Sequence, residues 1–458
     1  MFDPPTVELD EIESIHMIGV GGSGMSGLAK LLTQRGIRVT GSDVKPSAVI
    51  DSLAGVGVET WIGHRPDRIT DVDVVVASSA VPDQDPELEA ARRAGVTTAR
   101  RPALLRGVTT AYPTIGFSGT HGKTSSTAMA VAALRACGKD PSFIVGGEIA
   151  DLNTGAHLGD PDLLILEADE AFGTFRLLEL AGLTVTNIEA DHLDYYRTVT
   201  ALEEAFAQVS NRVDGPVLGC IDDPGVRRLA ERSTVIGYGT SSDAAWRIGD
   251  VTLDAEPSFS LTGHGRTRRV KLTQPGIHVV RNAAGVLSLL GELGFDLDCA
   301  IAGLETSGGV RRRFELKALI EGISVIDDYA HHPTEVRATL AAARTMTSGR
   351  LWVVFQPHRY TRTAALAPAF GSPLAEADRI IITDVYSAGE RPQPGVTGRL
   401  VAEAVRASGG DTTYIEHLAD VPERIAGQLE SGDTLILMGA GDVTTIWDQI
   451  ADRIGADS

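Results

Sequence analysis

The sequence contains few cysteines, and those that it has stand far apart. Three occur among 458 residues, at positions 137, 220 and 299. No two of them form the close Cys-x-x-Cys pair that is typical of zinc sites, and the spacing is unlike the dense framework of a small disulfide-bonded domain. We therefore expect neither a disulfide nor a zinc site, as in a protein of the reducing cytosol.

The sequence also lacks a membrane span and a secretion signal. No apolar run reaches the roughly 18 residues that a transmembrane helix needs. The first residues, MFDPPTVELDEIE, are acidic and contain no apolar core of a signal peptide. Both absences predict a cytoplasmic location.

Positive charge is scarce as well. The chain has 41 Lys and Arg against 61 Asp and Glu, which gives a net charge of −20. A general nucleic-acid or anionic-membrane binder needs a basic face, so we expect neither kind of partner. A local basic pocket for an anionic small molecule stays open.

Short apolar runs recur along the chain, each ending in Gly, Ser, Asp or Asn. Between them lie Ala- and Leu-rich stretches such as 125–138 and 336–346, so strands and helices alternate. Continuous apolar runs of this length are typical of strands buried on both faces, and the alternation predicts an α/β protein with mostly parallel sheets. The runs are 15–20, 72–79, 114–119, 163–169, 183–191, 323–328, 351–357, 379–385 and 434–442.

The length predicts three domains. We place them at 1–108, 109–310 and 311–458: a Rossmann-like domain, a central P-loop ATPase-type domain and a second Rossmann-like domain. The turn-rich stretch 239–275 predicts an antiparallel β insert in the second domain.

A glycine-rich turn follows the first strand. Gly19, Gly21, Gly22 and Gly24 precede a helical stretch, and a second strand ends about twenty residues on at Asp43. Backbone N–H groups at such a helix start can bind a diphosphate. The motif does not distinguish NAD, FAD and a UDP-sugar, and glycine-rich turns also occur for packing alone.

A second turn, GTHGKT at 119–124, lies between a strand and a helix. Lys123 could bridge the β- and γ-phosphates of a nucleotide, and the Thr124 hydroxyl could bind Mg²⁺. The usual P-loop has a further glycine where Phe117 stands, so a chance match is the alternative.

Acidic residues follow the next two strands. A Mg²⁺-nucleotide site needs such oxygen ligands, although either cluster alone could be a solvated loop. Two clusters beside a phosphate-binding loop favour the metal site. They are Glu167, Asp169 and Glu170, and then Glu189, Asp191, His192 and Asp194.

Basic and aromatic residues gather in the last third. The run 311–313 is three arginines, whose planar guanidinium groups suit phosphates, although a solvated linker is the alternative. The segment 326–335, IDDYAHHPTE, has adjacent histidines without the usual zinc spacing. The segment 355–363, FQPHRYTRT, could receive an anionic group such as a carboxylate.

Nine segments, taken in order, resemble the landmarks of the Mur ligase family over residues 15–443. They are IGVGGSGMSGLA, GTHGKTSS, EADE, TNIEADHLD, RRRFE, DDYAHHPTE, FQPHRYTRT, VYSAGERPQPGV and MGAGDV. The resemblance implies three domains and an ATP-dependent amide synthesis through an acyl phosphate, with ATP and Mg²⁺. FQPHRYTRT and VYSAGERPQPGV resemble the member that joins L-alanine to UDP-N-acetylmuramate. The short glycine spacing of GTHGKT is then a family trait.

The resemblance also implies roles for individual residues. The catalytic residues would be Lys123, Glu167, His192 and Arg313, and the metal ligands Thr124, Glu167 and His192. ATP would bind Gly119, Thr120, His121, Gly122, Lys123, Thr124, Ser125, Asn282, Arg313 and Asp328. The UDP-sugar would bind Gly19, Gly21, Gly22, Ser23, Gly24, Met25, Asp43, Ser78 and His192. The amino acid or substrate carboxylate would meet Tyr329, His331, Arg359 and Arg362.

The sequence departs from the family pattern in three places. Ala171 and Phe172 stand where Ser-Asp usually follows EADE, Val279 stands where an asparagine usually follows His278, and Ser307 replaces a phenylalanine. None of these changes replaces Lys123 or the implied metal ligands Thr124, Glu167 and His192.

Three other functions are weighed against the ligase. An oxidoreductase would explain the first glycine-rich turn alone. A nucleotide-binding regulator without catalysis would accommodate the departures, and a sister ligase would attach a preformed peptide instead of a single amino acid. We expect a monomer or a weak dimer.

Overall fold

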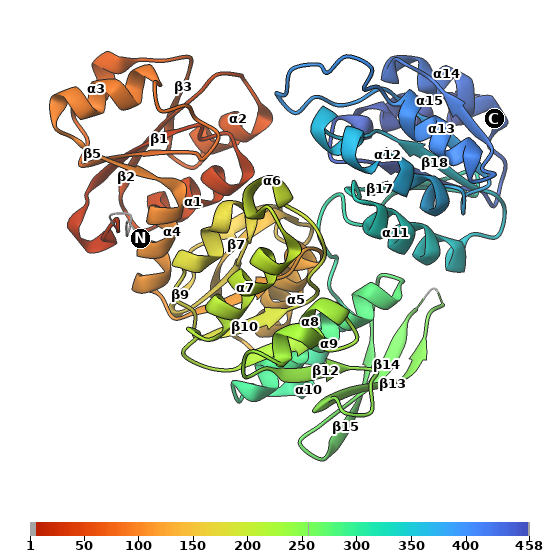
Figure 1. The fold of residues 1–458 in the computed structure, drawn as a ribbon, viewed down its shortest axis with the longest axis horizontal. Helices are drawn as coiled ribbons and strands as arrows, with labels where there is room; N and C mark the ends of the chain where they lie inside the picture. Colours follow the sequence, from red (N-terminus) through yellow and green to blue (C-terminus); the bar gives the residue numbers. More distant parts are fainter. Residues whose placement is uncertain (1–5, 255, 457–458) are drawn as a thin grey trace. The chain divides into compact units, whose positions relative to one another are not determined.

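The computed structural model describes residues 6–254 and 256–456. They form two compact units with three sheets (Figure 1). The first unit comprises the chain up to Gly249 with Ser260–Val270 and Arg281–Gly308. The second comprises Asp250–Phe259, Lys271–Val280 and the chain from Gly309.

The first sheet is parallel and has five strands in the order β3-β2-β1-β4-β5. The last residue of β1, Ile18, pairs with Ser42 and Ala77, so the neighbouring strands end at one edge. The elements are β1 (Ser14–Ile18), α1 (Ser23–Gln34), β2 (Arg38–Asp43), α2 (Ala48–Gly55), β3 (Glu59–Ile62), β4 (Val74–Ala77), α3 (Pro86–Ala94), β5 (Thr97–Arg100) and α4 (Arg101–Ala111).

The central sheet has ten strands in the order β15-β14-β13-β12-β11-β10-β6-β9-β7-β8. Parallel pairs at its centre end level with one another, because Phe117 pairs with Glu167 and Ser118 with Val185. Its strands are β6 (Thr114–Ser118), β7 (Pro141–Ile149), β8 (Thr154–His157), β9 (Asp160–Glu167), β10 (Gly182–Val185), β11 (Val217–Cys220), β12 (Ile236–Gly239), β13 (Trp246–Thr252), β14 (Ser258–Gly263) and β15 (Arg266–Lys271). The helices of this stretch are α5 (Lys123–Ala136), α6 (Leu193–Tyr196), α7 (Val199–Ser210), α8 (Pro224–Ala230), α9 (Ile277–Glu292) and α10 (Leu297–Glu305).

The third sheet has six strands in the order β16-β17-β21-β18-β19-β20. Only the β16–β17 pair is antiparallel among the pairs described. The elements are β16 (Glu315–Ile320), β17 (Ile323–Asp328), α11 (Pro333–Met346), β18 (Leu351–Phe355), α12 (Tyr360–Leu374), β19 (Arg379–Ile382), α13 (Arg399–Ala407), β20 (Thr412–Tyr414), α14 (Val421–Ile425), β21 (Thr434–Met438) and α15 (Trp447–Ala456).

The stretch 239–275 contains the three strands β13, β14 and β15, which extend one edge of the central sheet. Two residues, His264 and Gly265, join β14 to β15, and both have positive φ, of 49° and 73°. A two-residue loop of this kind joins antiparallel strands. The predicted insert is therefore part of the sheet.

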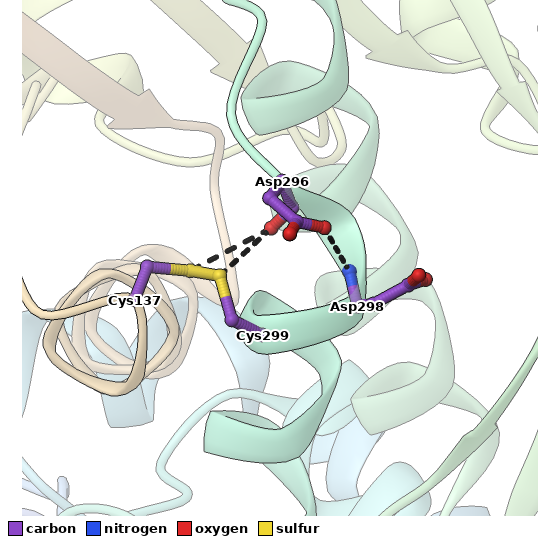
Figure 2. Close-up of a disulfide and its surroundings, with 4 residues drawn as sticks. All are labelled: Cys137, Asp296, Asp298 and Cys299. Atoms are coloured by element: carbon purple, nitrogen blue, oxygen red, sulfur yellow. Dashed lines mark hydrogen bonds between the residues drawn. A yellow bond between two sulfur atoms is a disulfide. The ribbon is translucent and has the colours of Figure 1, made fainter.

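The expectation of no disulfide is wrong. Cys137, at the end of α5, is bonded to Cys299 on α10, and their Cα atoms lie 5.1 Å apart (Figure 2). The two helices approach closely, since a Cβ added at Gly303 would lie 2.5 Å from the carbonyl oxygen of Ala132. Sequence spacing could not reveal the bond, because 162 residues separate the two cysteines.

Asp296 shapes the turn beside the disulfide. It caps α10 by accepting a hydrogen bond from the Asp298 N–H, 2.9 Å long, and its carbonyl oxygen lies 3.2 Å from Cys299 Sγ and 3.5 Å from Cys137 Sγ (Figure 2). The third cysteine, Cys220, is buried and free.

The described residues include no helix that is both long and apolar enough to cross a membrane.

Candidate functional site

The first glycine-rich loop connects β1 to α1. Gly19 has a φ of +77°, and a Cβ there would lie 3.1 Å from that of Ser78, so this turn needs glycine. The Gly19 N–H donates to the carbonyl oxygen of Ser42, and the Gly21 N–H donates to Asp43 Oδ2 at 3.0 Å. The loop is therefore held by residues at the ends of neighbouring strands.

The remaining residues predicted for the UDP-sugar lie on the same loop and helix, except His192, which is the N-cap of α6. Gly22 is the N-cap of α1, and Gly24 and the buried Met25 lie in its first turn. Ser23 begins the helix, and its side chain lies outside the described part of the chain. The structure brings the loop, Asp43 and Ser78 together.

A buried carboxylate, Glu87, is connected to this loop through Ser42, whose carbonyl oxygen accepts the hydrogen bond from Gly19. It accepts hydrogen bonds from the Ser42 hydroxyl, from Trp61 Nε1 at 3.0 Å and from the Arg65 N–H at 2.8 Å. His16 Nε2 lies 3.5 Å away. Burial opposes ionisation, but these partners outweigh it and lower the pKa of Glu87 to about 2.

Arg101, the first residue of α4, approaches the same loop. A Cβ added at Gly24 would lie 2.6 Å from Arg101 Cζ, so the guanidinium lies against the first turn of α1. Burial lowers the pKa of Arg101, while the charges of Asp169 and Glu167 act in the opposite direction. Arg101 was not selected from the sequence, although it directly precedes a proline at the start of a helical stretch.

The second loop, Gly119–Gly122, connects β6 to α5. Gly119 and Gly122 have φ values of +127° and +85°. Asn187 supports the loop on both sides, because its Oδ1 accepts from the His121 N–H at 2.9 Å and its Nδ2 donates to the His121 carbonyl oxygen at 3.0 Å. Thr120 Oγ1 accepts from the Glu189 N–H at 2.9 Å. The loop is thus fixed by the segment that follows β10.

Lys123 folds back into this loop. Its Nζ donates to the carbonyl oxygen of Gly119 at 2.7 Å and to Glu170 Oε2 at 2.8 Å, and Asp169 Oδ1 lies 3.4 Å away. Burial disfavours the ammonium, but the two carboxylates outweigh it and raise the pKa of Lys123. The lysine is therefore charged and neutralised within the protein.

The other residues predicted around the nucleotide are near this loop. Thr124 and Ser125 lie in the first turn of α5. Asn282 is buried on α9, and a Cβ added at Gly122 would lie 2.7 Å from its Oδ1. Asn282 thus lies against the second loop.

Asp169 and Glu170 of the first predicted acidic cluster lie close to His192 of the second, whereas the side chain of Asp194 lies outside the described part of the chain. Glu167 accepts hydrogen bonds from the Thr124 hydroxyl and from the Gly146 N–H, and burial nevertheless raises its pKa. Donor atoms of Asp169, Glu170 and His192 lie within 4.8 Å of one another. The pKa of Glu170 is raised by burial and by Asp169, although Lys123 opposes this.

These side chains fit a divalent cation with hard oxygen ligands. Thr124 and Glu167 form one pair, and Asp169, Glu170 and His192 form the adjacent group. Mg²⁺ prefers carboxylate and hydroxyl oxygens and keeps several waters, which suits this arrangement. His192 lies 3.7 Å from Glu170 Oε1 and has a φ of +54°.

The departure at Phe172 lies beside this group. Phe172 is 60% exposed with a φ of +54°, and its ring meets the edge of Tyr195 at 6.2 Å. A non-glycine residue in this backbone region is strained. The structure places Val279 and Ser307 among the buried residues.

In the second unit, Asp328 is fully engaged by its own chain. It accepts hydrogen bonds from the Phe314 N–H at 2.7 Å, the Ala330 N–H at 2.9 Å and the Thr339 hydroxyl at 3.0 Å. Burial raises its pKa. The guanidinium of Arg313 stacks 4.8 Å over the Tyr329 ring.

Two half-buried histidines lie near that ring. His331 Nδ1 is 2.9 Å from the carbonyl oxygen of Tyr329, and its ring centroid is 5.8 Å from that of His358. Burial lowers the pKa of His331 to about 4 and that of His358 to about 3, with Arg362 contributing to both. His358 stacks on Tyr386 at 5.7 Å. His358 was selected from the sequence as part of the segment FQPHRYTRT, and Tyr386 only as part of the segment VYSAGERPQPGV.

Arg359 follows His358, and its N–H donates to the carbonyl oxygen of Tyr386. Its Nε donates to Glu390 Oε1 at 2.8 Å, and its backbone has a φ of +70°. The Glu390 carboxylate also accepts from the Thr361 N–H and hydroxyl. The segment VYSAGERPQPGV thus contributes the counter-ion of Arg359.

Family models match three consecutive parts of the chain. The first is the Mur ligase family, catalytic domain, over residues 14–112; the second is the Mur ligase middle domain, over 117–290; the third is the Mur ligase, glutamate ligase domain, over 312–441.

Curated relatives match over nearly the full length. A UDP-N-acetylmuramate–L-alanine ligase of Mycolicibacterium vanbaalenii is 42% identical over 470 aligned residues, covering 97% of each chain. One of the same name from Kineococcus radiotolerans is 42% identical over 451, covering 96% of each. Among solved structures, the UDP-N-acetylmuramate-alanine ligase of Thermotoga maritima has a TM-score of 0.84 at 27% identity, covering 98% of this chain and 100% of that one.

Proposed function

The chain belongs to the Mur ligase family, and we propose that it joins L-alanine to the carboxylate of UDP-N-acetylmuramate with ATP, in peptidoglycan precursor synthesis. The observation that carries this function is the group around the second loop: Lys123 with Glu170, and Thr124 with Glu167, beside His192. The three domains follow the α/β architecture of the family. The domain boundaries given above stay a prediction.

We assign the first step to the second loop. ATP would place its phosphates on the N–H groups of Gly119–Thr124, and Lys123 would leave Glu170 for the phosphate oxygens. Mg²⁺, when bound, would be held by Thr124, Glu167 and His192 and would neutralise charge on the phosphates. The substrate carboxylate would then attack the γ-phosphate, which gives an acyl phosphate and ADP.

We assign the second step to the last third of the chain. The amine of L-alanine would attack the acyl carbon and release phosphate, and the amino acid's carboxylate would meet Arg359 or Arg362 beside Tyr329 and His331. His331 is neutral at pH 7, because its pKa is about 4, so it can accept a hydrogen bond there. Arg313 would contact the transferred phosphate and Asp328 the ATP ribose. An acyl phosphate hydrolyses readily, so this step needs a site that excludes water.

The remaining assignments concern the sugar nucleotide and the cell. The first loop, Asp43 and Ser78 would hold the UDP portion, and Asn282 the adenine of ATP. We also propose a cytoplasmic enzyme that acts as a monomer or a weak dimer.

Phosphate release from ATP and Mg²⁺ tests the function. We expect release only with UDP-N-acetylmuramate and L-alanine together, and no release with either alone. Release that needs a tripeptide in place of L-alanine would instead indicate the sister peptide ligase. ATP binding without release for any acceptor would indicate a non-catalytic regulator.

A further inference from the structure

Arg101 is a largely buried cation that lacks an ion-pair partner among the residues that the structure describes. Its Nε is buried and has no hydrogen-bond partner in the described part of the chain. Asp169 and Glu167 act on it only through their charges, and none of the described carboxylates forms an ion pair with it. A buried charge is costly unless it is paired, so a guanidinium in this position calls for an anion.

The surroundings of Arg101 indicate where that anion would lie. The guanidinium lies against Gly24, in the first turn of α1, where the helix start carries partial positive charge. The preceding loop offers further N–H groups to an anion. A cation and a helix start therefore converge on one place.

Neighbouring cations differ from Arg101 in this respect. Arg100 donates to the carbonyl oxygens of Ser78 and Val81 and pairs with Asp83. Lys123 is neutralised by Glu170. The lack of a partner is thus a property of Arg101 and not of the basic residues around the site in general.

We propose that Arg101 binds the diphosphate of the sugar nucleotide and positions it on the first loop. The identity of the ligand depends on the function proposed above. A guanidinium presents a planar set of donors that matches two phosphate oxygens at once. The substrate's carboxylate is the other anion available, but contact with Gly24 places Arg101 at the loop that would receive the diphosphate.

Calorimetric binding of three nucleotides tests this assignment. UDP, UDP-N-acetylglucosamine and UDP-N-acetylmuramate share the diphosphate, and only the last has the carboxylate. We expect Arg101→Ala to raise the Kd of all three by roughly 10- to 100-fold, and Arg101→Lys to raise it less. The control Arg93→Ala removes an exposed arginine of the same domain, which pairs with Glu89, and should leave the Kd unchanged.

A second variant, Gly24→Ala, changes the position of the Arg101 guanidinium without removing it. In Gly24→Ala the new methyl carbon would lie 2.6 Å from Arg101 Cζ and displace the guanidinium. We expect weaker binding of all three nucleotides in this variant too. Thermal unfolding of each variant shows that it is folded.

Three outcomes would overturn the proposal. Unchanged binding in folded Arg101→Ala would mean that Arg101 does not touch the ligand. Weaker binding of UDP-N-acetylmuramate alone would assign Arg101 to the carboxylate. Weaker binding of UDP-N-acetylmuramate and UDP-N-acetylglucosamine but not UDP would assign it to the sugar. Wild-type protein that binds none of the three would instead contradict the proposed function itself.

Discussion

Two loops of this protein have the same position between a strand and a helix but differ in how the basic side chain beside each is paired. Each follows a parallel strand and opens a helix with glycines, and each lies close to one basic side chain. In the second loop Lys123 is already neutralised by Glu170, whereas Arg101 beside the first loop has no such partner. A phosphate that binds the second loop must therefore replace Glu170 as the partner of Lys123. A phosphate that binds the first loop would displace no carboxylate from Arg101.

The buried carboxylates near the two loops also differ in the direction of their pKa shifts. Glu87, below the first loop, is surrounded by hydrogen-bond donors, and its pKa falls to about 2. Glu167 and Glu170, below the second loop, are buried together with Asp169, and their pKa values rise. Hydrogen bonds from its own chain thus stabilise the charge of Glu87. The carboxylates beside Lys123 instead lie close together, as in a site that binds a cation.

The largest effect is expected from Lys123→Ala. It removes the cation that we assign to the transferred phosphate, and it leaves Glu170 buried without its partner. We expect phosphate release to fall by about 10³-fold or more. Steady-state phosphate release measures it, with Lys139→Ala, an exposed lysine just beyond α5, as the matched control. Release within tenfold of the wild type would contradict the role of Lys123.

The next effect concerns acid stability and Glu87. Its pKa is lowered from 4.5 to about 2, which corresponds to roughly 3 kcal/mol of stability. Because the folded pKa is the lower one, this contribution is complete above about pH 4.5 and is lost as pH falls toward 2.

Urea unfolding between pH 7 and pH 2.5 measures this contribution. Glu87→Gln should be less stable than the wild type at pH 7, and the difference should shrink as pH falls. Glu89→Gln, at a partly exposed position two residues along α3, serves as the control. A difference that does not change with pH would show that the ionisation of Glu87 contributes nothing.

A smaller effect is expected from Asn187→Ala. It removes two hydrogen bonds that fix His121 in the second loop. The loss of one or two such bonds weakens a site by about 1–2 kcal/mol, so we expect the KM for ATP to rise by roughly 10-fold. Initial-rate kinetics measure it, and the exposed Asn211→Ala, at the end of α7, is the control. A lower kcat with an unchanged KM would mean that the loop positions the reacting groups and not the nucleotide.

The smallest effect concerns backbone strain. The first loop turns on a glycine, Gly19, while Phe172 beside the second site turns with a φ of +54°. Phe172→Gly should therefore be more stable than Phe172→Ala by about 1 kcal/mol, because both lose the ring and only one relieves the strain. Thermal unfolding of the two variants measures it. Equal stability would show that the protein tolerates this conformation without cost.

The sequence predicts the parts of the site that follow from strand ends. The glycines at 19–24 and 119–122, Asp43, and the acidic residues after β9 and β10 lie where a parallel sheet places them. Such residues are predictable because neighbouring parallel strands end at one edge.

Other parts depend on distances in space and were not predicted. Arg101 stands at the start of a helix that no motif marks, and its lack of a partner is visible only once Gly24, Asp169 and Glu167 surround it. His358 and Tyr386 meet through a bridge between two segments of the last third. The bond between Cys137 and Cys299 joins residues whose spacing matches no known pattern.

The bond between Cys137 and Cys299 can form only late in the synthesis of the chain. Cys137 leaves the ribosome 162 residues before Cys299, so the bond between them cannot form until nearly the whole central sheet has been synthesised. Once the bond has closed, a protease that cuts once between the two cysteines does not release a fragment. The nicked protein would run as one species on a non-reducing gel and as two after reduction.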